Sequence, residues 1–161
     1  MQEEFTKLIN QHKGIIHKVC NIFFYQHPYM EDYVQEIVIQ LWKSYPTFSH
    51  LSKFSTWMYR VALNTAIDIK RKEILSPKLM ALSNREFNLS DSERNESNDE
   101  RDQLYSAISR FPDIEKVVIL LYLEDYSYKE IAEIMGISES LTGVKINRIK
   151  NRLIKILNHG K

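Results

Sequence analysis

Residues 31–72 decide the fold: they read EDYVQEIVIQLWKSYPTF (31–48), SHLSK (49–53) and FSTWMYRVALNTAIDIKRK (54–72). Both long pieces repeat apolar residues at three- and four-residue steps, the period of an α-helix. The five residues between them are expected to form a short loop. Neither helix is simply amphipathic, because each carries a second face whose residue types are unusual for a solvated surface.

The helix expected at Glu31–Tyr45 has two distinct faces. One is apolar and predicts the core: Val34, Ile37, Val38, Leu41 and Tyr45. The other places an isoleucine among polar side chains: Asp32, Gln35, Glu36, Ile39 and Lys43. An apolar centre with a polar rim is typical of a small protein-binding patch. The alternative is a single exposed isoleucine, which is common on protein surfaces, and the pattern alone favours that alternative.

A second helix is expected from Ser55, as N-cap, to Lys72. Its predicted core face is Met58, Val61, Ala62, Thr65 and Ile69. A different face gathers Trp57, Arg60, Asn64, Ile67 and Arg71. A tryptophan ring can stack on bases, arginine can hold phosphate and asparagine can read a base edge, so this face suits nucleic acid. The alternative is that Trp57 belongs to the core and the basic end, 70–72, complements the helix dipole.

The order of these residues resembles a known family. The matching residues are Asp32-Tyr33-Val34-Gln35-Glu36, Leu41-Trp42, Pro46-Thr47-Phe48, Phe54-Ser55-Thr56-Trp57-Met58-Tyr59-Arg60 and Asn64-Thr65-Ala66-Ile67-Asp68. Together they resemble domain two of the sigma-70 family, in its extracytoplasmic-function (ECF) branch. The match is long, ordered and ungapped, which makes it much more specific than a short motif.

The resemblance implies two binding surfaces. The face with Asp32, Gln35 and Glu36 would dock on the clamp helices of the largest subunit of core RNA polymerase, and Ile39 shares that face. The loop before Phe54 and the second helix would recognise and open the promoter −10 element. The residues expected to do so are Trp57, Arg60, Asn64 and, on the same face, Arg71.

Composition supports a helical protein with an uneven distribution of charge. The 161 residues fit one domain or two small ones, 43% hydrophobic residues suffice for packed cores, and only four glycines and four prolines favour helices over strands. The net charge of +1 argues neither for nor against nucleic acid. However, acids concentrate between Glu86 and Glu115, and only basic charges follow Glu139. This asymmetry predicts an acidic spacer and a basic contact surface.

The expected compartment is the cytoplasm. Cys20 is the only cysteine, so no intramolecular disulfide can form, which fits a reducing environment. Residues 1–10 are polar and acidic, unlike a signal peptide, and no apolar run is long enough to cross a bilayer. We therefore expect no membrane insertion.

The periodicity along the chain predicts an all-α fold of two small helical domains. A helix at Glu3–Phe24 completes a bundle with the two helices above, giving a first domain over residues 1–75. Residues 76–100 are acidic and rich in serine and asparagine, which predicts a flexible linker. In the resembled family such a linker threads through the polymerase; the alternative is a plain solvated tether. Residues 101–161 form the second domain.

Residues 127–153, SYKEIAEIMGISESLTGVKINRIKNRL, have the layout of a helix-turn-helix. Ser127 and Glu130 form a capping box, Gly136 supplies the turn, and Ser138 caps the last helix, which runs to about Leu157. The alternative is a basic amphipathic helix in a bundle. The capping box, the turn and the short first helix favour the helix-turn-helix.

The last helix separates a buried stripe from a predicted DNA-binding face. The stripe is Thr142, Ile146, Ile149, Leu153 and Ile156; the DNA-binding face is Ser140, Leu141, Val144, Lys145, Arg148 and Arg152. The first residues of that face can meet base edges, whereas the basic ones can grip phosphate. This stretch resembles sigma domain four, which reads the −35 element. It departs from the family at Thr142, where an aliphatic residue is usual, and at Leu141, where a small polar one is common.

No residues suited to catalysis stand out. The five histidines are scattered without a metal-binding motif, and the four glycines form no phosphate loop. We therefore expect no catalytic residue, metal or cofactor.

The chain is thus expected to be a non-catalytic sigma factor. It would direct bacterial RNA polymerase to specific promoters and start transcription by −10 and −35 recognition and promoter melting. The alternative is a stand-alone helix-turn-helix regulator, which would need a ligand-binding or dimerisation module in its first half. An enzyme has no supporting residues. Whether an anti-sigma factor also binds the chain is left open by the sequence.

Overall fold

The computed structural model describes residues 1–25, 27–75 and 99–159. All regular secondary structure within these residues is helical, and they contain no β-strand. These residues fall into two compact units, 1–75 and 99–159. The prediction of an all-α protein with two small helical parts is confirmed. Each unit is described by itself.

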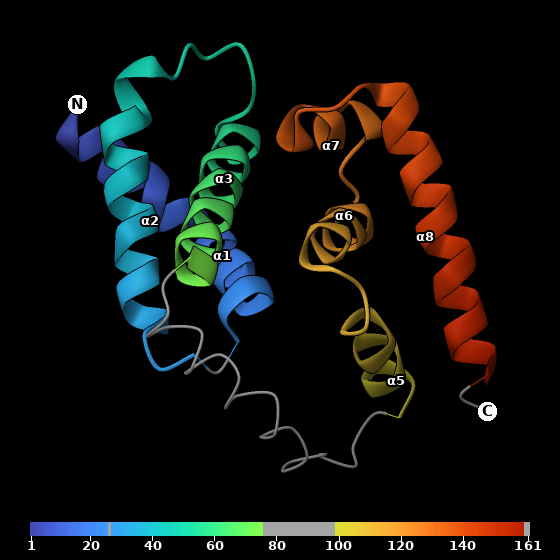
Figure 1. Ribbon diagram of the computed structural model, residues 1–161. Coiled ribbons are helices and arrows are strands. Elements are labelled where there is room, and N and C mark those ends of the chain that lie inside the picture. The colour runs from blue at the N-terminus through green and yellow to red at the C-terminus, as the bar shows by residue number, and fades with distance from the viewer. Residues whose placement is uncertain (26, 76–98, 160–161) are drawn as a thin grey trace. The chain divides into compact units, whose positions relative to one another are not determined.

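The first unit is a bundle of three long helices (Figure 1). They are α1 (Gln2–Phe24), α2 (Met30–Ser44) and α3 (Phe54–Leu75), and a single 3₁₀ turn, η1 (Tyr45–Thr47), follows α2. Helix α1 contains non-helical backbone at His12, with φ −118° and ψ 15°. The three helices pack against one another, and α3 contacts both others.

Helix α3 is buried on two sides. Its predicted core residues Met58, Ala62, Thr65 and Ile69 are buried, but so are Tyr59, Leu63 and Ala66. These extra residues are buried because α3 packs against α1 and α2 at once. A sequence pattern with a single apolar face therefore underestimates the core of this unit.

The predicted N-cap of α3 is wrong. The helix begins at Phe54, and the Trp57 amide already donates to the Lys53 carbonyl at 3.1 Å. Ser55 therefore lies inside the first turn. Serine is a frequent N-cap, but here the chain turns helical one residue earlier, as the buried Phe54 packs against Phe48 and Trp57.

The second unit consists of α5 (Asp99–Ile108), α6 (Asp113–Leu123), α7 (Tyr128–Met135) and α8 (Glu139–His159). Its core side chains are Ala107, Phe111, Val117, Val118, Ile119, Leu121, Ile131, Ala132, Ile134, Thr142, Ile146 and Ile149. Of the predicted linker, residues 76–98 lie outside the described residues, and 99–100 belong to the first turn of α5. The flexibility of the linker stays a prediction.

The helix-turn-helix has the local bonds that its sequence predicts. The Ser127 hydroxyl accepts from the Glu130 amide at 3.1 Å, and the Glu130 carboxylate accepts from the Ser127 amide at 2.9 Å, which completes the capping box. Gly136 ends α7 with a φ of 68°, a left-handed conformation that favours glycine. The Ser138 hydroxyl accepts from the Leu141 amide at 3.1 Å and caps α8.

The part of the chain that the structure describes lacks two features. Within 1–25, 27–75 and 99–159, no helix is long and apolar enough to span a bilayer. In the same part of the chain, no group of histidine, cysteine, aspartate or glutamate side chains is arranged to hold a metal ion.

Candidate protein and nucleic-acid interfaces

The predicted protein-binding patch lies on the exposed side of α2. Asp32, Gln35, Glu36 and Ile39 are all exposed, and the isoleucine keeps 53% of its surface in contact with solvent. On the opposite side, Ile37 is fully buried. The two isoleucines of one helix thus have opposite surroundings, and only Ile39 is available to a partner.

Trp42 extends the apolar part of this patch. It lies three residues after Ile39, on the same side of α2, and is 41% exposed. Its ring also makes an edge contact with Phe5, at 5.0 Å between centroids. Trp42 was not predicted as part of the patch, although its i, i+3 spacing from Ile39 was a sufficient signal.

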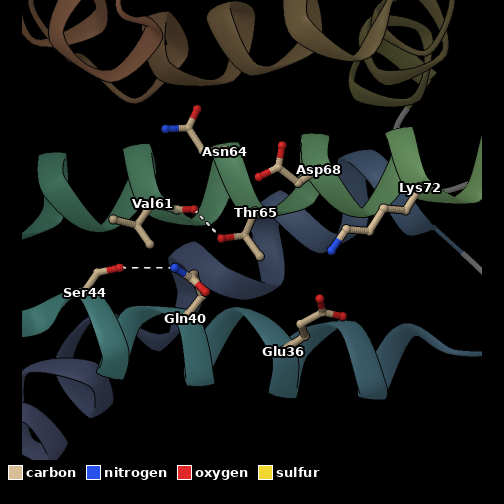
Figure 2. A pocket seen from close by; sticks show the side chains of 8 residues that line it. All are labelled: Glu36, Gln40, Ser44, Val61, Asn64, Thr65, Asp68 and Lys72. Atoms are coloured by element: carbon tan, nitrogen blue, oxygen red, sulfur yellow. Dashed lines mark hydrogen bonds between the residues drawn. The ribbon is translucent and has the colours of Figure 1, made fainter.

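A polar groove of about 270 Å³ separates the α2 patch from α3 (Figure 2). Its walls are Glu36, Gln40 and Ser44 from α2 and Val61, Asn64, Thr65, Asp68 and Lys72 from α3. Two hydrogen bonds order the walls: Gln40 to the Ser44 hydroxyl at 3.4 Å, and the Thr65 hydroxyl to the Val61 carbonyl at 2.7 Å. The groove thus joins one residue of the predicted protein-binding set, Glu36, to one of the predicted DNA-binding set, Asn64.

Trp57 belongs to a cluster of aromatic rings and is also partly exposed. Its ring centroid lies 5.2 Å from Phe48, 5.4 Å from Phe54 and 6.3 Å from Tyr45. The side chain is half-buried rather than buried. Trp57 can therefore be both a packing residue and a DNA-binding residue, because one part of its ring packs in the unit and another part faces solvent.

Three other residues of this predicted DNA-binding face are exposed. Arg60, Asn64 and Arg71 are all open to solvent on α3. Lys70, in contrast, turns back over the Phe23 ring of α1 at 5.6 Å. At the basic end of α3, Lys70 thus packs on α1 whereas Arg71 stays in solvent.

The loop at 49–53 presents an apolar side chain beside this face. Leu51 is 92% exposed, although leucine is normally shielded from water. His50 adopts a φ of 59° and its ring contacts Phe48 at 4.4 Å, which ties the loop to the aromatic cluster. Sequence reasoning named the loop but not Leu51, because exposure cannot be read from a segment without periodicity.

A polar cluster fixes the far end of α3. The Tyr33 hydroxyl donates a hydrogen bond to the Glu73 carboxylate, and His27 Nε2 lies 3.5 Å from the same carboxylate. Tyr33 is on α2 and His27 precedes it, so Glu73 joins both to α3. Residues this far apart in sequence show no common pattern, and the cluster was not predicted.

The predicted DNA-binding face of α8 is largely open. Ser140 and Arg148 are exposed, Leu141 and Val144 are 43% and 45% exposed, and Lys145 is half-buried. On the other side Thr142, Ile146 and Ile149 are buried, which confirms the first part of the predicted stripe; Leu153 and Ile156 are half-buried. Thr142 is accommodated there because its hydroxyl donates to the Ser138 carbonyl at 2.9 Å.

Two basic side chains of α8 contact the rest of the second unit. Arg152 pairs with the Glu115 carboxylate at 2.9 Å, and its guanidinium lies 4.7 Å from the centre of the Phe111 ring. The Lys150 ammonium lies 4.3 Å from the centre of the Tyr122 ring, and a hydrogen bond with Tyr122 raises the pKa of Lys150. Arg152 was predicted to grip phosphate; its side chain is 53% exposed, and its guanidinium is paired with Glu115 of α6.

Family comparisons agree with this arrangement. The family model for sigma-70 region 2 matches residues 8–73, and that for sigma-70 region 4 matches residues 101–153. The ECF RNA polymerase sigma factor SigW of Bacillus subtilis is 29% identical over 168 residues, covering 97% of this chain and 90% of SigW. The RNA polymerase sigma factor SigZ of the same organism is 30% identical over 131 residues, covering 80% of this chain and 72% of SigZ.

Solved structures share the fold at low identity. The sigma factor RpoE from Bartonella quintana, in complex with the anti-sigma factor NepR, has a TM-score of 0.71 at 17% identity and covers 97% of this chain and 98% of its own. CnrH, in complex with the cytosolic domain of CnrY, has a TM-score of 0.69 at 20% identity and covers 100% of this chain and 92% of its own. Together, these matches show that the chain belongs to the sigma-70 family of RNA polymerase sigma factors, in its ECF branch, and acts in promoter recognition and transcription initiation.

Proposed function

We propose that the chain is a non-catalytic specificity subunit, in which three surfaces divide the work of promoter recognition. The observation that supports this most is on the first unit. It carries an exposed protein-binding patch on α2 and a basic, aromatic face on α3. A stand-alone regulator has no use for that combination, since it needs a ligand-binding or dimerisation module instead.

The α2 patch is the proposed docking surface for core polymerase. Asp32, Gln35 and Glu36 supply a polar rim, and Ile39 an exposed apolar centre that Trp42 enlarges. Burying such a centre inside a polar rim is the usual anatomy of a protein interface. The proposed partner is the pair of clamp helices on the largest subunit of polymerase, which also places the protein in the cytoplasm.

The α3 face and the preceding loop are the proposed −10 surface. Arg60 and Arg71 can hold the DNA backbone, and Asn64 can hydrogen-bond an exposed base edge. The exposed part of Trp57 can stack on an unpaired base, worth about 1–3 kcal/mol. Leu51 adds an apolar side chain of the kind that wedges between base steps.

Helix α8 is the proposed −35 surface. Its first turns offer Ser140, Leu141 and Val144 to base edges, and Lys145 and Arg148 to phosphates. Arg152 was predicted with this set, but its contacts with α6 support a different role.

An anti-sigma factor is a further proposed partner. Two structural neighbours, RpoE and CnrH, were solved with the anti-sigma factor NepR and with the cytosolic domain of CnrY. A protein that covered Ile39 and Trp42 would block polymerase docking, which makes this patch a suitable target for inhibition.

In vitro transcription tests the proposal. Core bacterial RNA polymerase would be incubated with the full chain and a template library that carries a randomised promoter region, and the transcripts sequenced. We expect initiation from a small set of templates that share two elements. Template selection that is unchanged when the chain is omitted would contradict the proposal, as would specific DNA binding by the chain with no transcripts.

A further inference from the structure

Two contacts at opposite ends of α6 bear on the rotation of α8 about its own axis, called its roll below. Lys150 lies over the ring of Tyr122, in the last turn of α6. Arg152 pairs with Glu115, in the first turn of α6, and lies over Phe111 just before it. One turn of α8 is thus held by both ends of the helix it crosses.

These two contacts lie on opposite sides of the buried stripe. Ile149 faces the core at 5% exposure. At about 100° per residue, Lys150 lies about 100° to one side of Ile149 and Arg152 about 60° to the other. Rotating α8 about its axis would lengthen one contact while it compressed the other, so the pair resists rotation in both directions.

The orientation of the predicted base-reading residues depends on this roll. Val144 lies eight residues before Arg152, about 12 Å along the helix axis, on a neighbouring side of the helix. A rotation of α8 within the second unit would move Val144 and Leu141 relative to the rest of the DNA-binding surface. Base readout is sensitive to such a displacement because hydrogen-bond and methyl contacts act over short distances.

We propose that Arg152 is a positioning residue for −35 recognition: its ion pair with Glu115 and its contact with Phe111 set the orientation of the base-reading turns of α8. This inference rests on the proposed function of α8. The Glu115 carboxylate already balances the charge of Arg152, so its guanidinium adds little net attraction for phosphate. Arg148, one turn earlier and exposed, is the matched candidate for a phosphate contact.

Replacing Glu115 tests the proposal, because the direction of the change in DNA binding distinguishes the two possible roles of its carboxylate. Removing a negative charge near DNA normally strengthens binding, since phosphates repel carboxylates. If Glu115 instead holds Arg152 in place, Glu115→Gln should weaken discrimination between the preferred upstream element and a scrambled one. We expect a loss of up to about fivefold, the size of an exposed ion pair.

The probes are the duplex that the wild-type holoenzyme selects from a randomised library and a duplex with its upstream element scrambled. Affinity for both is measured over a range of salt with Glu115→Gln, Arg152→Gln and the double variant. We expect Arg152→Gln to lose at least as much discrimination as Glu115→Gln, because it also removes the contact with Phe111, and the double variant to lose no more than Arg152→Gln. The salt slope should stay at its wild-type value. Arg148→Gln should lower that slope by about one unit, whereas Arg110→Gln controls for the loss of an exposed arginine of the same unit.

Two results would overturn the assignment: a lower salt slope for Arg152→Gln, or undiminished discrimination for Glu115→Gln. Exchanging the pair, as Glu115→Arg with Arg152→Glu, provides a second check, because it should recover part of the discrimination only if the contact itself matters. Failure of the proposed function looks different, since the wild-type holoenzyme would then select no preferred duplex.

Discussion

At the scale of single residues, Trp57 contributes to packing and to the proposed −10 surface at once. Its ring packs against Phe48 and Phe54 and is half-buried. Truncating a fully buried aromatic ring costs about 3–5 kcal/mol. For this half-buried ring we expect Trp57→Ala to lower the free energy of unfolding by about 1–3 kcal/mol, as measured by urea denaturation followed by circular dichroism.

The same variant should also impair promoter opening at temperatures where it stays folded. Because a stacking partner for an unpaired base is lost, opening of duplex promoters should fall, and a template with a pre-melted bubble should recover much of the activity. Trp57→Phe is the control, since it keeps a ring in the cluster. If the bubble rescued nothing while the variant remained folded, Trp57 would have a packing role alone.

Cys20 couples the stability of the first unit to pH. Burial raises the pKa of its thiol from 9.0 to about 11. The folded state therefore keeps the proton at a pH where the unfolded state has lost it. The resulting stability is complete below about pH 9 and is lost as pH rises towards 11.

We accordingly expect the free energy of unfolding to fall by up to about 1.4 kcal/mol per pH unit across this window. Cys20→Ala should be less stable at pH 8, because it leaves a small cavity, yet flatter between pH 9 and 11. Denaturation of both proteins at several pH values measures the difference and cancels the titration of other groups. Parallel pH profiles for the two would contradict the assignment.

At the scale of the secondary-structure element, the sequence pattern predicted which residues form helices better than it predicted where the helices touch. The capping box at Ser127 and the turn at Gly136 were predictable because a few adjacent residues determine each of them. The first residue of α3 was not, since Phe54 joins the helix through packing with Phe48, which lies before the loop.

The candidate surfaces show the same contrast between features set by local sequence and features set by distant contacts. The exposure of Ile39 follows from helical spacing alone. The pairing of Arg152 with Glu115, however, joins residues 37 positions apart. Periodicity places Arg152 on the exposed side of α8 with Arg148 but cannot show that Glu115 lies beside it.

Helix α2 offers two isoleucines for a matched comparison. Ile39 is 53% exposed and Ile37 is fully buried. Ile39→Glu should therefore weaken co-purification with core polymerase and leave thermal unfolding nearly unchanged, because the new charge stays in water. Ile37→Glu would bury an unpaired carboxylate and should prevent folding. An Ile39→Glu variant that still bound polymerase as tightly as wild type would exclude this patch as the docking surface.

Replacing glycine by alanine should have opposite effects on stability at two positions. A Cβ added at either Gly14 or Gly136 would contact nothing within 4 Å. Gly136, however, has a φ of 68°, so Gly136→Ala should destabilise α7 and the turn by about 1 kcal/mol or more. Gly14→Ala, inside α1, should stabilise by about 0.5–1 kcal/mol, because alanine loses less conformational entropy in a helix. Native-state hydrogen exchange of each helix measures both effects, and equal signs would contradict the argument.

At the scale of the whole molecule, the proposed mechanism draws the energy for opening DNA from binding. No nucleotide-binding motif is present in the sequence. Releasing a base from its stack costs a few kcal/mol, and the contacts proposed for Trp57, Asn64 and Arg60 amount to a similar sum. Because these terms nearly cancel, recognition of a second DNA element is what makes opening selective among many A·T-rich sites.

We expect promoter binding to depend strongly on the spacing of the two DNA elements. One chain carries both proposed DNA-binding surfaces, so binding of the first element makes binding of the second intramolecular. Such coupling can raise the overall affinity by about 10²–10⁴ over a single element. We expect the holoenzyme to bind a duplex with both selected elements far more tightly than either element alone.

Inserting five base pairs between the elements turns one of them by about half a helical turn, since B-DNA has about 10–10.5 base pairs per turn. Most of the gain in affinity should then be lost, although both sequences remain intact. Holoenzymes with Arg148→Gln should already have lost part of that gain and should respond less to the insertion. If wild-type binding were indifferent to the spacing, the two surfaces would not engage one promoter together, and selective opening would have to arise from the −10 surface alone.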